Sequence, residues 1–177
     1  RWWLIRTATS LPWWKCRDFP MMQSVDTTLL NQLTEKAKAS PRLRMNHNFH
    51  PRDASTCHRL LNAIEPGSYI HPHCHLDPEK DETFVLLRGK LGVICFTEQG
   101  AISETVLLSA GTDQIITTIP HGLFHTAVSL AAGTIFFEAK AGPYLPFQAA
   151  EKAAWAPADT TDAATSYLNQ LCSLFTA

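Results

Sequence analysis

The sequence predicts a mainly β protein, an antiparallel sandwich or barrel with one helix before it and one after it. The main observation is a series of short apolar runs after Cys57, separated by turns rich in Gly, Pro and Asp. Amphipathic helical patterns occur only before and after this series. We expect about eight strands, at residues 59–64, 69–75, 82–88, 90–96, 102–108, 114–119, 124–130 and 134–140.

Residues 1–22 are interpreted as an extension outside the core. They hold four of the five tryptophans but lack the continuous apolar core and small-residue cleavage site of a signal peptide. One interpretation is upstream sequence that is not part of the folded unit. The alternative is an amphipathic arm that packs on a partner subunit, because tryptophans at this density rarely stay in water.

Residues 23–56 are expected to form a helix followed by an arm. Asp26 is suited to cap a helix that runs through about Ala39, and Ser40 and Pro41 end it. The next ten residues, 42–51, are polar and predicted to be irregular.

Residues 57–147 are assigned to the barrel and residues 148–177 to a linker and a final helix. The linker contains Trp155, and residues 159–161 can cap a helix that runs through Leu174. Some strands are apolar on both faces, notably residues 93–96, so a terminal helix or a second subunit must cover the outer face. We predict a homodimer, because a two-fold partner is the commonest way to bury a self-complementary patch.

Composition excludes some classes of function. The 177 residues suit one domain, and 45% hydrophobic with 18% charged residues is ordinary for a globular protein. A net charge of −1 argues against a nucleic-acid binder, because no basic excess exists to neutralise phosphates. No uncharged apolar run is long enough to span a bilayer. The five cysteines form no CxxC pair, which indicates reduced thiols and a cytoplasmic protein.

Three histidines at alternate positions, His71, His73 and His75, indicate a metal site. Alternate residues of a strand share a face, and Glu82 opens the next predicted strand. His125 opens a later strand, after a turn made by Pro120 and Gly122. The predicted ligands of one divalent transition metal are His73, His75, Glu82 and His125. Imidazoles with one carboxylate suit iron, manganese, nickel, zinc or cobalt and suit neither calcium nor magnesium.

Two further groups are candidates for contacts to substrate or to the ligands. His71 shares the face of His75 but would lie about 13 Å from it along a strand, too far to bind the same ion. Glu138 and Lys140 share one face of the last strand. They form either a buried pair near the site or a surface pair at the strand end.

The spacing of these residues resembles the two motifs of the cupin superfamily. The first motif matches Gly67-x5-His73-x-His75-x6-Glu82-x6-Gly89, and the second matches Pro120-x-Gly122-x2-His125. Three departures occur: six residues rather than three or four separate His75 from Glu82, and Gln114 and Ser129 replace the usual Gly and Asn. The resemblance implies a cupin jelly-roll barrel that holds a metal. In some cupins an arm closes a neighbour's barrel, which would place His50 near the substrate; the alternative is a loop histidine that faces water.

A closer resemblance, to the WbuC family of cupin-fold metalloproteins, covers roughly residues 26–171. The matching stretches are Ser40-Pro41-Arg42, Asn46-His47-Asn48, Arg59-Leu60-Leu61-Asn62, His71-Pro72-His73, Glu82-Thr83-Phe84, the segment 137–144 and Trp155-Ala156-Pro157. That family is associated with bacterial surface-polysaccharide (O-antigen) gene clusters. The resemblance implies a small-molecule ligand derived from a sugar.

These patterns lead to two hypotheses about function. The first is a metal-dependent enzyme, an isomerase or an iron-dependent dioxygenase, that acts on a sugar or a sugar-derived molecule. The second is a non-catalytic cupin in which the metal organises a ligand-binding or regulatory pocket. The sequence shows no separate nucleophile with an adjacent base, so any catalysis is expected to depend on the metal.

Overall fold

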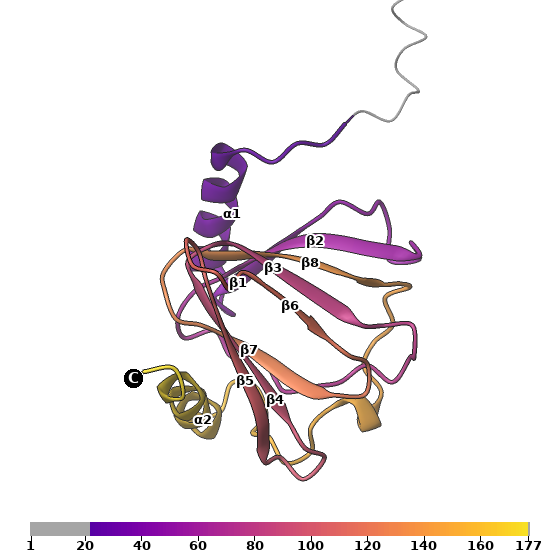
Figure 1. Cartoon of the computed structure of the whole chain (residues 1–177), viewed down its shortest axis with the longest axis vertical. Helices are drawn as coiled ribbons and strands as arrows, with labels where there is room; N and C mark the ends of the chain where they lie inside the picture. Colours follow the sequence, from indigo (N-terminus) through magenta and orange to yellow (C-terminus); the bar gives the residue numbers. More distant parts are fainter. Residues whose placement is uncertain (1–21, 177) are drawn as a thin grey trace, which may run out of the picture.

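The computed structural model of the chain describes residues 22–176, so the predicted extension falls almost wholly outside the described residues. Eight strands in this part of the chain form two antiparallel sheets that face one another (Figure 1). The elements are α1 (Thr27–Ala39), β1 (Arg44–Asn48), β2 (Cys57–Ile64), β3 (Glu82–Arg88), β4 (Lys90–Phe96), β5 (Ile102–Ser109), β6 (Ile116–Ile119), β7 (Phe124–Ser129), β8 (Thr134–Ala141) and α2 (Asp162–Ser173).

The two sheets have the strand orders β1-β2-β8-β3-β6 and β5-β4-β7. Within residues 22–176 no ladder between strands joins the sheets into a closed barrel. The mainly β jelly-roll architecture with flanking helices that the sequence predicts is confirmed, with two facing sheets in place of a continuous barrel. Apolar side chains fill the space between the sheets, including Phe84 and Phe136 from one side and Leu91 and Val93 from the other.

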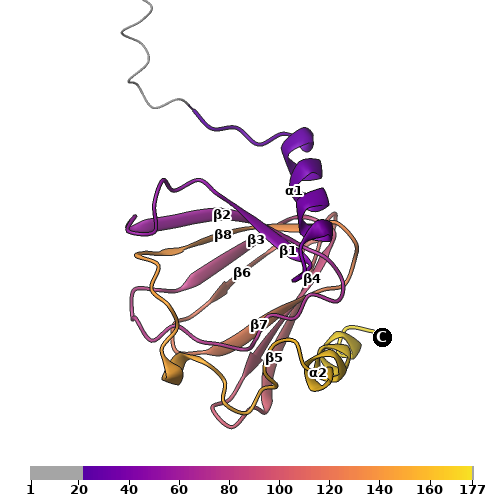
Figure 2. The ribbon, with the colours of Figure 1, turned by 180° about the vertical axis from the view of Figure 1, so that it is seen from behind.

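Both predicted helices are present, with the predicted caps. The carboxylate of Asp26 accepts a hydrogen bond of 2.8 Å from the amide of Leu29, and the hydroxyl of Thr161 accepts one of 3.1 Å from Ala164. Each helix covers the outer face of one sheet (Figure 2). None of the helices in the described residues is long and apolar enough to cross a membrane.

Two local predictions are wrong. Residues 69–75 form no strand; they are a loop in which His73 alone makes an antiparallel bridge to His125 and another to Lys152. Pro72 has no backbone N–H, so a ladder cannot continue through it. Conversely, the arm predicted to be irregular contains β1, which pairs with β2 along its whole length. Four of its five side chains are polar, with Met45 the exception, so it lacks the apolar alternation by which strands are recognised.

The outer face of β4 is covered by its own chain. Leu168 and Leu171 of α2 pack with Ile94, Phe96 and Val128 of the three-stranded sheet. This contact covers β4 but not residues 106–108 of β5, the other strand for which the homodimer was predicted, so the dimer stays a prediction with less support. Apolar side chains remain exposed elsewhere in the described residues, at Leu87, Ile102, Leu107, Ile115 and Ile116.

We expect Leu168→Ala to lower the free energy of unfolding by about 2–5 kcal/mol, because it leaves a cavity under α2. Leu168 is 4% exposed, whereas Leu107 on β5 is 38% exposed. Leu107→Ala is the matched control and should change stability by about 0.5 kcal/mol or less. Urea titration of both variants tests the contact, and equal effects would mean that α2 does not protect the sheet in solution.

Candidate metal centre

Three separate segments bring the predicted ligands together. His73 and His75 lie in the loop between β2 and β3, Glu82 is the first residue of β3, and His125 is the second residue of β7. The loop is tied to β7 by two hydrogen bonds, from the amide of His73 to the carbonyl of His125 (3.0 Å) and from the amide of His125 to the carbonyl of His73 (2.8 Å). Thus the bridge, rather than a strand, fixes the two loop histidines.

The ligand atoms of His73, His75, Glu82 and His125 all lie within 4.8 Å of one another. His75, Glu82 and His125 are buried, and His73 is partly buried. Cys74 is buried away from this group, with its thiol directed at the carbonyl of Ala150, as strand-like alternation predicts. The sequence therefore identified a group of side chains that the fold does place side by side.

Backbone carbonyls orient two of the imidazoles. Nδ1 of His73 is 3.0 Å from the carbonyl oxygen of His71, and Nδ1 of His125 is 2.9 Å from that of Leu123. A carbonyl only accepts, so both Nδ1 atoms carry the hydrogen. The opposite nitrogen, Nε2, is then free to bind a metal, which is the usual arrangement around metal-binding histidines.

The four ligand atoms fit a transition-metal ion after a small contraction. With bonds of about 2.1 Å, two atoms on opposite sides of an ion are about 4.2 Å apart. The observed limit of 4.8 Å exceeds that by a few tenths of an ångström. Three imidazole nitrogens with one carboxylate oxygen suit iron, manganese, nickel or zinc, in agreement with the donor types predicted from the sequence.

The hydrogen bonds of His125 also favour a cation at this position. Its Nδ1 donates to Leu123, while its Nε2 lies 3.2 Å from the carboxylate of Glu82, which also only accepts. Both contacts are hydrogen bonds only if this buried ring carries two hydrogens and a positive charge. A metal held by His125 and Glu82 would take the place of the second hydrogen and leave the ring neutral.

Lys140 joins Glu82 to a second buried carboxylate. Its ammonium lies 2.5 Å from Glu82 and 2.7 Å from Glu138, and the amide of Asn62 donates to Glu138 at 2.7 Å. The side chains of Glu82 and Lys140 stand opposite each other on β3 and β8. The alternative of a surface pair at the strand end is therefore wrong: both Glu138 and Lys140 face inward, and Lys140 contacts the predicted ligand Glu82.

The pKa values in this group reflect burial and the neighbouring charges. Burial alone would raise the pKa of Glu82, but the Lys140 ammonium and hydrogen bonds from His125 and His75 hold it well below its usual value. Burial, and then repulsion by Glu82, raise the pKa of Glu138. Burial and the nearby His125 lower the pKa of His73 to about 3. A neutral His73 beside an ionised Glu82 is the state in which both can bind a metal.

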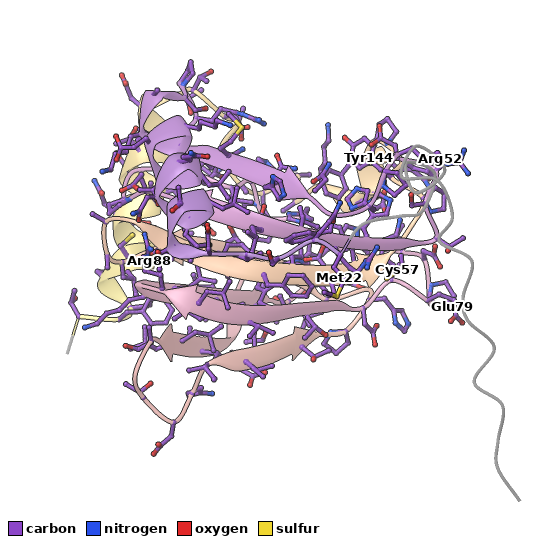
Figure 3. The ribbon with its side chains drawn as sticks, turned by 90° about the horizontal axis from the view of Figure 1, so that it is seen from above. Met22, Arg52, Cys57, Glu79, Arg88 and Tyr144 are labelled. Carbon is purple, nitrogen blue, oxygen red and sulfur yellow. The ribbon has the colours of Figure 1, made fainter. Side chains whose placement is uncertain are left out.

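Phe147 covers the histidines and was not identified from the sequence. Its ring centroid lies 5.5 Å from that of His75, at an interplanar angle of 22°, and 4.6 Å from that of His73. It belongs to the segment after β8, in which Tyr144 lies at the same end of the molecule as Cys57 and Glu79 (Figure 3). No spacing in the sequence relates this segment to the histidines, because only the fold brings it over them.

A cavity of about 260 Å³ opens beside the four predicted metal ligands, between the two sheets. His73, Glu82 and His125 line it together with Glu138 and Lys140. Four more polar residues line it from β1, β2 and the turn before β1: Arg42, Arg44, Asn46 and Asn62. Sequence reasoning missed these four residues as site residues, although three of them lie in the arm for which a role near the site was considered.

The other two candidate histidines, His71 and His50, lie apart from the four predicted ligands. His71 lies beside a neighbouring cavity, and its Nδ1 is 2.9 Å from the carbonyl of Pro72. His50 is buried against His58, with the two rings stacked at 4.0 Å and 20°. Neither belongs to the group of ligand atoms. A role for His71 at the substrate stays a prediction, and His50 has a packing role within its own chain.

Comparisons with known proteins assign no activity to the chain. A family profile described as a domain of unknown function (DUF6016) matches residues 25–108, and no curated protein sequence matches the chain. KdgF from Halomonas sp. is 17% identical with a TM-score of 0.45; the match covers 58% of this chain and 82% of that one. The protein TT1209 from Thermus thermophilus is 20% identical with a TM-score of 0.47, covering 68% and 97%.

Oxalate decarboxylase from Lactobacillus farciminis, solved as a formate complex, is 22% identical with a TM-score of 0.41. The match covers 51% of this chain and only 25% of the decarboxylase. At these TM-scores the three structures assign neither a metal nor a substrate to this chain. Neither they nor the family description names the WbuC family, so that resemblance stays a prediction.

Proposed function

We propose that this protein holds one divalent transition metal with His73, His75, Glu82 and His125 and uses it on a small molecule bound in the adjoining cavity. The observation that carries the proposal is the group of four ligand atoms within 4.8 Å of one another. Three of the four residues also line the cavity, so a molecule inside it lies next to the metal position.

A bound divalent ion would supply Lewis-acid polarisation of a substrate oxygen. The residues around it have roles that follow from their own contacts. Lys140 holds the carboxylate of Glu82 in place, and because an ammonium has three hydrogens it can also donate to a substrate oxygen in the cavity that it lines. Glu138 offers an acceptor on the same wall. Phe147 lies over two of the histidines and excludes water from that side.

The predicted substrate is a sugar or a sugar derivative connected with bacterial surface-polysaccharide (O-antigen) biosynthesis. This part of the proposal rests on the resemblance to the WbuC family. Amide side chains in the cavity wall, Asn46 and Asn62, are compatible with hydroxyl groups, since each offers both donors and an acceptor.

The alternative function is a non-catalytic protein in which the same metal organises a binding pocket. An iron-dependent dioxygenase is a third function compatible with the same ligands, because iron shares them with the other transition metals. The ligand geometry is common to all three, so the identity of the metal and the fate of a bound molecule decide between them.

The test is metal analysis of the full chain purified without a histidine tag, followed by a turnover screen with sugar phosphates and nucleotide sugars. We expect close to one equivalent of a divalent transition metal per chain. Turnover that is lost on chelation and restored by the metal supports the enzyme. Iron with oxygen uptake supports the dioxygenase. A metal-loaded protein that is stabilised by one compound without converting it supports the binding protein. A chain that acquires no metal contradicts the proposal.

A further inference from the structure

The inner face of the five-stranded sheet carries a row of polar side chains that runs from the exposed Asn46 to the buried Glu82, beside the apolar core. Asn46 on β1 stands opposite Asn62 on β2, Asn62 donates to Glu138 on β8, and Glu138 accepts from Lys140, which also contacts Glu82. Other side chains on the same inner face, such as Phe84 on β3 and Phe136 on β8, are apolar and pack into the core. Packing alone therefore does not account for the polar row.

Arg44 lies at the β1 end of this row and lines two cavities that the predicted ligand His73 also lines. Both the cavity of about 260 Å³ and a neighbouring one of about 450 Å³ are lined by Arg44 and by His73. Nη1 of Arg44 donates to the carbonyl of Tyr69 at 2.7 Å and to the hydroxyl of Ser68 at 3.3 Å. These bonds hold the guanidinium in place, and within residues 22–176 its other nitrogens make no hydrogen bond.

The cationic side chains of the cavity are not balanced alike. Lys140 contacts two carboxylates, whereas neither Arg42 nor Arg44 has a carboxylate within 4.0 Å among the described residues. Burial, and then the like charge of Arg42, lower the pKa of Arg44, and Asp159 in the neighbouring cavity opposes this more weakly. Two close guanidinium groups without an ion pair form a site that an anion would neutralise.

We propose that Arg44, assisted by Arg42, binds an anionic group on the small molecule that the proposed metal site acts on. The anionic group is a carboxylate or a phosphate. The inference rests on the proposed function and adds a class of substrate to it: a small hydroxylated anion. Arginine binds both kinds of anion through paired N–H groups, and Asn46 and Asn62 supply partners for hydroxyls between the two ends. A cavity of about 260 Å³ has the size of a pocket for a small metabolite.

The test measures binding of three probes to the full chain by calorimetry: D-gluconate, glucose 6-phosphate and uncharged glucose. Each is titrated into metal-free and Zn²⁺-loaded protein, and the Zn²⁺ content of each sample is determined separately. We expect one of the two anions to bind more tightly than glucose, and which one binds distinguishes a carboxylate from a phosphate ligand. Arg44→Gln should weaken that anion by about ten- to hundredfold and leave the Zn²⁺ content unchanged.

Two further variants keep the test decisive. Arg42 is exposed and its side chain makes no hydrogen bond within the described residues, so Arg42→Gln should fold normally and weaken the anion several-fold. Arg88, which lies beside α1 and bonds to Asn31, is the matched control, and Arg88→Gln should bind like the wild type (Figure 3).

Equal binding of glucose and both anions, or unchanged anion binding by Arg44→Gln and Arg42→Gln, would overturn the inference. If the protein takes up no Zn²⁺ but binds an anion, and Arg44→Gln weakens that binding, the proposed metal function is refuted and the anion site is not. The anion site would stand in that case, because the metal-free titrations report on it independently.

Discussion

Replacing His75 with Ala should abolish stoichiometric binding of a divalent metal. His75 is buried, and its Nε2 lies 2.6 Å from Glu82, in direct contact with another predicted ligand. Without it the three remaining ligands lose the paired histidines of the loop, and an alanine in this position offers no donor. We expect Zn²⁺ or Ni²⁺ affinity to fall by about a hundredfold or more, measured by titration against a competing chelator.

His47→Ala is the matched control for this variant. His47 lies on β1, contacts the ring of Phe49 and is not part of the ligand group. It should keep a full equivalent of metal. If His75→Ala also keeps a full equivalent, with the affinity of the wild type, the proposed ligand set is wrong.

Replacing Lys140 with Met should destabilise the metal-free protein by about 3–5 kcal/mol, because two buried carboxylates lose their shared counter-charge. Glu82 and Glu138 have side chains only 3% and 10% exposed, so water solvates them less well than the ammonium does. Methionine fills a similar volume, which separates the charge effect from the loss of packing. Denaturant unfolding of metal-free protein measures the loss.

A divalent metal should restore part of this stability. It places positive charge next to Glu82, so added Zn²⁺ should stabilise Lys140→Met more than it stabilises the wild type. Glu138→Gln combined with Lys140→Met should also lose less stability than Lys140→Met alone, since one of the two charges is removed.

Lys38→Met is the control for removing a lysine from a contact with a carboxylate. Lys38 lies 2.9 Å from Glu35, but the two side chains are 50% and 71% exposed. Exposed pairs of this kind contribute about 0–1 kcal/mol, so this variant should stay close to the wild type. A loss below about 1 kcal/mol in Lys140→Met would show that the buried contacts do not persist in solution.

Much of the fold could be predicted because its signals are local. β3 and β4 begin and end where the apolar runs do, and Gly89 between them has φ +82°, a conformation that favours glycine. A side chain at Gly89 would also clash with Thr134. The caps Asp26 and Thr161 act on amides three residues away, so the residues that determine them are neighbours in the sequence.

The failed predictions concern partners that local patterns do not specify. Alternating histidines at residues 71–75 look the same in a strand and in an extended loop. Pro72, which has no backbone N–H, is the residue that favours the loop. β1 forms because β2 offers it a free edge, and its polar side chains carry no sign of that edge. Likewise the sequence showed that the second apolar face of β4 must be covered, but it could not distinguish α2 from another subunit as the cover. In the structure α2 covers it.

By itself the sequence determined the types and order of the metal-binding side chains, the apolar strands and the two capped helices, since each depends on residues close together in the chain. Only the tertiary structure decided which side chains surround them. Lys140 meets Glu82 across 58 positions, and Asn62 meets Glu138 across 76. Phe147 packs on His73, and Arg44 lines the same cavity as His73 and His125. Such contacts arise when the sheets pack and buried charges must find partners, and packing between distant segments leaves no periodic pattern in the sequence.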